Sequence, residues 1–510
     1  MRRSVFEISR TAAAGRRGRL EIPRADCTIE TPAMLPVVNP HVQSIEPATL
    51  AEEFGAEILI TNAYVLYQSD DLHDEALERG VHDLLGFPGA IMTDSGSFQL
   101  AEYGTIDVDT PTIMTFQDEI GTDIATPVDI PTPPDADRSR AAAELARTNE
   151  AIAAAAAYDC GDMLVSAPIQ GGRYLDLREQ AAERAYRAGL DVFPVGAVVP
   201  LLREYRFDDI TRIVDAAKRG LAADAPVHLF GAGHPMMFSL GVALGCDLFD
   251  SAAYALYARE GRYLHPTGTT ALDDLETFPC ACPVCTDMTP KTLRGLPSAE
   301  RDRTLAMHNL YVTFAELRRV RQAITEGTLL ELVEARVRAH PRLLDGYRAM
   351  LARSDRIRAE TPVSGQRPMF YLSAESARRP LVVRHHRRLE RLAVPDELVL
   401  IDPQLEADPS IAGHFADDMA GPAVTTDATV WYIVPPFGPV PPALGETYPL
   451  TAELPRIRDR AAYDAAVTGI DAICERTASI TLVHADWPTP VLDALAPSVA
   501  TTTDPAEVSP

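Results

Sequence analysis

GAIMTDSG (residues 89–96) and CDLFDSA (residues 246–252) belong to a series of eight short apolar runs that decides the fold. Amphipathic, alanine-rich stretches separate the runs, and many of the runs end in polar or small residues. Eight strands alternating with helices are typical of a (β/α)8 barrel of the TIM type, whose active site is built at the carboxyl ends of the strands. The other six runs are PAMLPVV (32–38), AEILITNAY (56–64), DIATPVDI (123–130), MLVSAPIQGG (163–172), VFPVGAVV (192–199) and VHLFGAG (227–233).

A doubly wound parallel sheet is the alternative α/β fold. Such a sheet would carry a glycine-rich phosphate-binding turn after its first strand. The first run continues as PVVNPHVQ (36–43), which contains no glycine. The sequence therefore favours the barrel, which we expect to occupy residues 1–360.

The charge balance of the chain is strongly acidic. Its 510 residues include 47 Lys and Arg against 73 Asp and Glu, a net charge of −26. Such an excess of acid usually argues against nucleic-acid binding, because phosphate contacts need Lys and Arg. Few of the basic residues are lysine, however, and this pattern is typical of proteins kept hydrated in a cytoplasm of very high salt. We expect a halophilic origin, in which case net charge is a poor guide to the partner.

The cysteine content and the lack of long apolar runs bear on the compartment. Seven cysteines, three of them in one motif, do not form a disulfide framework and favour a reducing cytoplasm. No run of about 18 apolar residues, as a membrane span requires, is present. The arginine-rich start lacks the apolar core of a signal peptide, and FEIS (6–9) with RLEIP (19–23) predicts a hairpin there. We expect a cytoplasmic protein without a membrane partner.

Three cysteines lie within six residues of a proline-rich loop, as Cys280-x-Cys282-x2-Cys285, and His308 follows on a helix predicted from about 300 to 325. Buried cysteines can be simple hydrophobic residues, but three at this spacing are typical of a zinc site. Four protein ligands leave no position for water, so the zinc would be structural. We predict one structural zinc ion at residues 280–308.

Two aspartates end apolar runs and precede small residues, Asp94 in TDSG and Asp250 in FDSA. Either one alone could merely cap a helix or a turn. Two carboxylates at strand ends of one barrel suit chemistry at a glycosidic bond, where one attacks the anomeric carbon and another acid or base manages the proton of the leaving base. We predict that Asp94 and Asp250 are catalytic.

Further strand-end residues are candidates for binding a flat base. Asp129 can accept the N–H donors of a purine-like base, and Gln170 offers both a donor and an acceptor. Gly171 would let the backbone approach a ring closely. Gly196 and Ala197 are similarly small, although small residues at strand ends more often serve packing.

A second domain is expected after the linker SGQRP (364–368). We predict a smaller α+β C-terminal domain over residues 361–497 and a disordered tail over residues 498–510. The basic segment RRPLVVRHHRRLERL (378–392) stands out in so acidic a chain. Its residues Arg384, Arg387 and Arg388 are candidates for RNA phosphate binding, and a solvated helix face is the alternative reading.

Several unusual strings occur in an order that resembles the archaeal tRNA-guanine transglycosylases. They are TDSGSFQ (93–99), PIQGG (168–172), LFDSAAYALYA (248–258), CACPVC (280–285) with His308, FYLSAES (370–376), PPFGPVP (435–441) and TLVHADWP (481–488). The resemblance implies a 7-cyano-7-deazaguanine tRNA-ribosyltransferase, a pentosyltransferase of archaeosine biosynthesis. Such an enzyme replaces guanine at position 15 in the tRNA D-loop with 7-cyano-7-deazaguanine, without ATP or a redox cofactor.

The resemblance also implies residue roles. Asp250 would be the nucleophile that forms a covalent ribosyl-aspartate intermediate, and Asp94 the general acid and base; the reverse assignment stays open. The zinc ligands would be Cys280, Cys282, Cys285 and His308. The residues implied to bind the base are Ser95, Asp129, Gln170, Gly171, Gly196 and Ala197.

Many members of that family end in a small RNA-binding PUA domain, and no segment of this sequence matches one. We therefore expect that a separate PUA-domain protein could be a partner, and the resemblance suggests a homodimer. Two rival readings are an archaeosine synthase paralogue, which amidates the nitrile on tRNA, and a noncatalytic zinc-bearing subunit that binds tRNA. Neither would be expected to keep both Asp94 and Asp250, so the sequence favours the enzyme.

Overall fold

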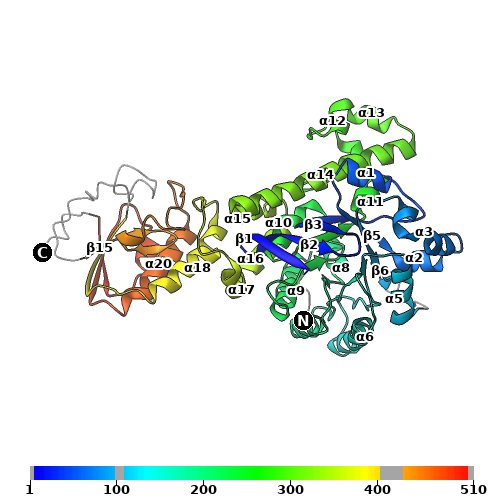
Figure 1. Cartoon of the computed structure of the whole chain (residues 1–510). Helices are drawn as coiled ribbons and strands as arrows, with labels where there is room; N and C mark the ends of the chain where they lie inside the picture. Colours follow the sequence, from blue (N-terminus) through cyan, green and yellow to red (C-terminus); the bar gives the residue numbers. More distant parts are fainter. Residues whose placement is uncertain (1–4, 98–107, 403–428, 504–510) are drawn as a thin grey trace. The chain divides into compact units, whose positions relative to one another are not determined.

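The computed structural model describes residues 5–97, 108–402 and 429–503. The chain divides into two compact units, unit 1 with residues 1–325 and 335–350, and unit 2 with residues 326–334 and 351–510 (Figure 1). Phe98 and Gln99 of the TDSGSFQ motif lie outside the described residues. Among the described helices, none combines the length and the apolar character that crossing a membrane would need.

Short parallel strands form the centre of unit 1 (Figure 1). They pair in two groups of four, in the orders β5-β6-β7-β8 and β4-β11-β10-β9. Parallel bridges connect the groups, from Val37 to Ile60 between β4 and β5, and from Ser166 to Val192 between β8 and β9. The pairings therefore run in chain order from β4 to β11 and return to β4. The bounds are β4 Ala33–Pro36, β5 Ile58–Asn62, β6 Ala90–Asp94, β7 Ile124–Ala125, β8 Leu164–Val165, β9 Phe193–Val195, β10 Val227–Leu229 and β11 Leu248–Ser251.

A three-stranded antiparallel sheet covers the amino ends of these strands. Its strands are β1 Phe6–Ala12, β2 Gly15–Ile22 and β3 Cys27–Thr31, and the predicted hairpin between β1 and β2 is confirmed by their antiparallel register. Leu20 and Ile29 of this sheet share one buried core with Ile58 and Ala90, the first residues of β5 and β6. The carboxyl ends of the parallel strands are left to build a site.

Helices follow the strands and lie around them (Figure 1). The neighbours α5, α6, α7 and α9 pack against one another in chain order. Side-chain caps begin several of them, as at α2, where the backbone N–H of Val65 donates to Asn62 Oδ1 over 2.9 Å. The bounds are α1 Pro47–Glu52, α2 Ala63–Gln68, α3 His73–Leu85, α5 Thr110–Glu119, α6 Arg138–Ala156, α7 Leu175–Arg187, α8 Val199–Arg203, α9 Phe207–Gly220 and α10 Pro235–Ala243.

The segment after β11 carries the cysteine motif. The long helix α14 contains His308 and confirms the helix predicted there from the sequence. The bounds are α11 Ala253–Arg259, β12 Arg262–His265, β13 Gly268–Ala271, α12 Pro283–Asp287, α13 Pro290–Arg294, α14 Ser298–Glu326, α15 Leu329–Val337, α16 Pro341–Ala352 and α17 Ser354–Glu360.

Unit 2 contains a five-stranded sheet in the order β16-β15-β14-β17-β18. Strands β15, β14, β17 and β18 are parallel, and β16 pairs antiparallel at one edge. Apolar clusters that include Trp431 and Tyr432, neighbours on β15, pack separately, as the alternation of side chains along a strand requires. The bounds are α18 Pro380–Leu389, β14 Glu397–Ile401, β15 Thr429–Val434, β16 Gly438–Val440, α20 Arg460–Cys474, β17 Ser479–Val483, α21 Thr489–Leu492 and β18 Val499–Thr502.

Two expectations for this region differ from the structure. The sheet is mostly parallel, unlike the α+β arrangement predicted, because long connections such as the one through α20 bring strands back in the same direction. The prediction of a disordered tail from residue 498 is wrong for Val499–Thr502, which form strand β18 against β17. This strand is too short and too polar to be recognised without its partner. Residues 504–510 of that predicted tail lie outside the described part of the chain.

A buried arginine stabilises the start of α18 in unit 2. The Arg379 side chain is fully buried, and its Nε donates to Glu334 Oε1 over 2.7 Å, while Nη1 pairs with Glu331. Ser376 Oγ donates to Glu334 Oε2 over 2.7 Å. Removing one partner from a buried ion pair is costly, because the remaining charge is shielded from water and has no opposite charge beside it.

We expect Arg379→Ala to lower the free energy of unfolding of unit 2 by about 3–5 kcal/mol, because it leaves Glu334 buried without its cation. Arg387→Ala is the matched control, since the ion pair of Arg387 with Asp355 is exposed and should contribute little to stability. Denaturant unfolding of the two variants in molar salt measures the difference. Equal effects would contradict a structural role for Arg379.

Candidate active site and metal centre

Three carboxylates gather where the central strands end. Asp94 is the last residue of β6, Asp250 lies near the end of β11, and Asp129 follows β7. Burial is the main cause that raises the pKa of Asp94, to about 7, and the charges of Asp129 and Asp250 raise it further. The backbone N–H groups of Gly96 and Ser95 act in the opposite direction. The structure therefore brings the predicted catalytic residues together, with a proton available at Asp94 near neutral pH.

Asp250 is held by two donors from the neighbouring strand and turn. Its Oδ1 lies 2.8 Å from Nε2 of His228 on β10 and accepts the backbone N–H of Gly231 over 2.8 Å. Among the described residues, no donor forms a hydrogen bond with Oδ2. The side chain of Asp250 is 12 % exposed. Two donors on one oxygen leave the other oxygen for chemistry.

The residues predicted to bind a base converge beside Asp129. Gln170 Nε2 donates to Asp129 Oδ2, and the backbone N–H of Asp129 donates to Ser97 Oγ over 3.2 Å. Burial raises the pKa of Asp129, while the hydrogen bonds from Ser97 and Gln170 lower it. A Cβ at Gly196 would lie 2.3 Å from Gln170 Nε2, so a larger residue there would displace the amide of Gln170 from Asp129. Gln170 Oε1 is buried and has no partner in the described part of the chain, so it could accept from a ligand.

The backbone around these residues is also specialised. Ser95 Oγ lies 2.9 Å from Ser97 Oγ and donates to the carbonyl of Pro127 over 3.0 Å, which makes Ser95 a support for the turn rather than an exposed contact. Gly171 has φ +133° and Ala197 has φ 57°, both in the left-handed region. A non-glycine residue held there is commonly part of a functional site.

Arg178 was not identified from the sequence. It lies on α7, is 1 % exposed, and donates to the carbonyls of Ile169 over 2.6 Å, Gly172 over 2.9 Å and Gly196 over 3.0 Å. Burial lowers the pKa of Arg178 to about 9, and the charge of Asp129 opposes that shift. Arg178 therefore joins the ends of β8 and β9 next to the residues predicted to bind a base. An arginine on an amphipathic helix gives no sign in the sequence of such burial.

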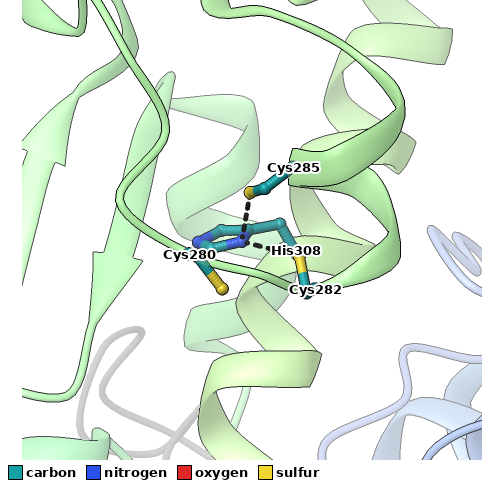
Figure 2. Close-up of side chains that lie close together, drawn as sticks. All are labelled: Cys280, Cys282, Cys285 and His308. Carbon is teal, nitrogen blue, oxygen red and sulfur yellow. Dashed lines mark hydrogen bonds between the residues drawn. The ribbon is translucent and has the colours of Figure 1, made fainter.

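The predicted metal ligands form a tight cluster (Figure 2). One ligand atom from each of Cys280, Cys282, Cys285 and His308 lies within 4.8 Å of the others. His308 Nδ1 lies 3.4 Å from Cys282 Sγ and 3.3 Å from Cys285 Sγ, while its Nε2 is 3.0 Å from the carbonyl of Leu264. That carbonyl accepts the Nε2–H and leaves Nδ1 as a ligand. The cluster could therefore hold a metal ion.

The cysteine–histidine cluster and the adjacent Asn309 contact the segment that follows Asp250. The ring of Tyr263 stacks on His308 with centroids 3.7 Å apart, and its hydroxyl lies 3.2 Å from Cys285 Sγ. Asn309, next to His308, donates to the carbonyl of Tyr254 over 3.2 Å and accepts from the N–H of Leu264 over 3.0 Å. Through Asn309 and His308, α14 is thus bonded to α11 and β12, which directly follow the Asp250 strand.

The arginines predicted to bind RNA lie on α18 in unit 2. Arg384 donates to the backbone carbonyls of Arg358, Thr361 and Pro362. It thereby provides hydrogen-bond donors for carbonyls at the C-terminal end of α17. Burial lowers the pKa of Arg384. Arg387 is exposed and pairs with Asp355 over 2.7 Å, and Arg388 is half-buried. The guanidinium of Arg384 is therefore occupied by backbone carbonyls, whereas the side chains of Arg387 and Arg388 lie nearer to solvent.

The chain also matches a known protein family over most of its length. The family described as queuine tRNA-ribosyltransferase matches residues 11–342, and the chain belongs to this family. The membership predicted from the sequence motifs is confirmed.

Individual relatives are similar over almost the whole chain. A protein of Haloarcula marismortui named tRNA-guanine(15) transglycosylase is 58% identical over 490 residues, 96% of each chain. A protein of the same name from Haloferax volcanii is 56% identical, over 98% of this chain and 93% of its own length. One from Methanocaldococcus jannaschii is 45% identical over 89% of this chain and 69% of its own length.

The raised pKa of Asp94 predicts how stability depends on pH. The pKa rises from 3.8 to about 7 on folding, so the folded protein holds this proton more tightly than the unfolded chain, and stability is lost as pH rises from about 4 through about 7. Asp94→Asn removes the ionisation with little change of shape. Relative to this variant, we expect the wild type to lose up to about 1.4 kcal/mol of unfolding free energy per pH unit in that window.

Denaturant unfolding of both proteins across pH 4–8 at constant salt checks this. Asp109→Asn is the matched control, because the cap at Thr112 lowers the pKa of Asp109 from 3.8, so that this residue contributes a dependence of opposite sign only below about pH 4 and none in this window. A difference between wild type and Asp94→Asn that stays constant with pH would contradict the buried, proton-holding Asp94.

Proposed function

We propose that this chain exchanges guanine at position 15 of tRNA for 7-cyano-7-deazaguanine, a step of archaeosine biosynthesis. The observation that carries the proposal is the convergence of Asp94, Asp250 and Asp129 at the strand ends, with Asp94 able to hold a proton near neutral pH. The names of the relatives from Haloarcula and Haloferax support it.

Two displacements at one carbon account for the exchange. A carboxylate oxygen of Asp250 donates its electron pair to C1′ of the ribose while the C1′–N9 bond breaks, and that bond's electron pair leaves on N9 of guanine, which takes a proton from Asp94. The incoming base then gives its N9 proton to Asp94, attacks C1′ and displaces the Asp250 carboxylate. The sugar configuration is retained after two inversions. The donors at Asp250 Oδ1 favour Asp250, rather than Asp94, as the nucleophile.

Base recognition is assigned to the residues beside Asp129. The carboxyl group of Asp129 accepts N–H groups of the base, and Gln170 Oε1 provides a further buried acceptor. Gly171, Gly196 and Ala197 would bring the backbone close to the ring, and Ser95 supports the turn that carries Ser97.

The cysteine–histidine cluster fits structural zinc. Three thiolates and an imidazole Nδ1 form the tetrahedral donor set that zinc prefers, and the Leu264 carbonyl fixes the histidine tautomer. Zinc bound there would link His308 on α14 to the cysteine loop at α12, and it would take no part in the base exchange. The proposal is supported by the filled donor set, which leaves no position for a water molecule.

We expect Cys282→Ser to lose zinc and to lower the melting temperature of unit 1 by more than about 5 °C, because metal binding contributes directly to folding. Cys160→Ser is the matched control, since Cys160 is half-buried outside the cluster. Metal analysis and thermal unfolding of both variants measure the effect. A zinc content equal to that of wild type in Cys282→Ser would contradict the assignment.

The remaining assignments extend the proposal. The strand pairings that return from β11 to β4 support a closed (β/α)8 barrel in residues 1–360, followed by an accessory domain in residues 361–497. Arg387 and Arg388 are the proposed RNA phosphate contacts of that domain. We further propose a homodimer in a cytoplasm of high salt, served by a separate PUA-domain protein.

The deciding experiment is incorporation of labelled 7-cyano-7-deazaguanine into unmodified tRNA in molar salt. We expect uptake by wild type, no uptake by tRNA with adenine at position 15, and a loss of at least about 10³-fold in Asp250→Asn with tRNA binding retained. Asp109→Asn should match wild type.

The other outcomes separate the rival readings. Wild type that binds tRNA and zinc without any uptake would support the noncatalytic subunit. Conversion of a nitrile already present on tRNA would support the archaeosine synthase paralogue. Uptake that persists in Asp250→Asn would exclude Asp250 as the nucleophile.

A further inference from the structure

We infer that His228 is a positioning residue which selects Oδ2 of Asp250 as the attacking oxygen and assists its departure from the ribose. The inference rests on the proposed base exchange and adds a residue to it. His228 lies in the middle of β10, between the core residues Val227 and Leu229, and its side chain is fully buried. The sequence gives no sign of it, because one histidine inside an apolar run is commonly a packed core residue.

The tautomer of His228 follows from its surroundings. Nδ1 is buried and has no hydrogen-bond partner in the described part of the chain. A proton on Nδ1 would be an unsatisfied buried donor, which is costly. The proton therefore resides on Nε2, which lies 2.8 Å from Asp250 Oδ1 and donates to it. Phe230 packs edge-on against the imidazole, with ring centroids 4.6 Å apart, and limits its movement.

The two oxygens of Asp250 are consequently unequal. Oδ1 accepts from both His228 Nε2 and the backbone N–H of Gly231, so its lone pairs are engaged. Oδ2 has no such donor among the described residues, and it forms the new bond to C1′ while the C1′–N9 bond breaks and its electron pair leaves on N9. In the intermediate, Oδ1 is the carbonyl oxygen of a neutral ester and still faces His228.

The hydrogen bond from His228 Nε2 stabilises the free carboxylate of Asp250 and its ribosyl ester to different extents. A hydrogen bond to a carboxylate is about twice as strong as one to a neutral carbonyl. His228 therefore stabilises the free carboxylate more than the ester, and it lowers the cost of expelling the carboxylate when the second base attacks. Without this donor, the ribosyl-aspartate ester should persist and the carboxylate should lose its fixed orientation.

The geometry gives a sharp test with two amides. Gln places its amide nitrogen near the position of His Nε2, whereas Asn reaches only the position of Nδ1. We expect His228→Gln to stay within about threefold of wild type in kcat, and His228→Asn and His228→Phe to lose about 10- to 100-fold in kcat with KM for the base nearly unchanged. The fraction of covalent tRNA–protein adduct trapped on a denaturing gel should rise in Asn and Phe and not in Gln.

His484→Phe is the matched control, because His484 is also buried and its Nδ1 has no hydrogen-bond partner among the described residues, but it lies in unit 2 after β17. It should leave both kcat and the adduct fraction unchanged. Equal kcat and equal adduct in the Gln, Asn and Phe variants, while wild type exchanges bases, would overturn the role of His228. If His228→Phe does not fold, the comparison of Gln with Asn decides alone. Absence of exchange in wild type would instead refute the proposed function on which the inference rests.

Discussion

The burial of three neighbouring carboxylates is the constraint on which the rest of the site depends. Parallel strands that start from one apolar core must end at the same side, so Asp94, Asp250 and Asp129 are forced into proximity. Each is accommodated differently. Asp94 keeps a proton, Asp129 receives donors from Ser97 and Gln170, and Asp250 receives a backbone N–H and an imidazole N–H. In the proposed exchange, these unequal surroundings would make three similar groups an acid, a recognition group and a nucleophile.

The sequence predicted the parts of the site that local pattern determines. Asp94 and Asp250 are visible because a carboxylate after an apolar run and before small residues is unusual, and the cysteine spacing is visible because ligands of one ion lie close together in the chain. Arg178 and His228 were missed for a physical reason. Their burial depends on neighbours far away in sequence, the carbonyls of Ile169 and Gly196 for one and Asp250 for the other.

In unit 2, too, the features that depend on contacts between distant parts of the sequence could not be predicted. The apolar strands β14, β15 and β17 were foreseen, but the direction of their pairing and the short strand β18 depend on distant partners. The sequence alone does not distinguish the arginines of the basic segment 378–392 from one another. In the folded chain, Arg379 pairs with a buried carboxylate, Arg384 donates to backbone carbonyls, and Arg387 remains exposed. Composition locates such a segment without saying which of its charges face water.

The antiparallel sheet β1–β3 has a consequence for the order of events in the proposed exchange. Its apolar residues fill the amino end of the strand assembly, so in the proposed exchange a base would reach Asp250 from the carboxyl end. One set of base-contacting residues would hold one base at a time. In the proposed exchange, release would then precede entry, the kinetics would be ping-pong with tRNA retained throughout, and the departing guanine would be a competitive product inhibitor of the base that replaces it.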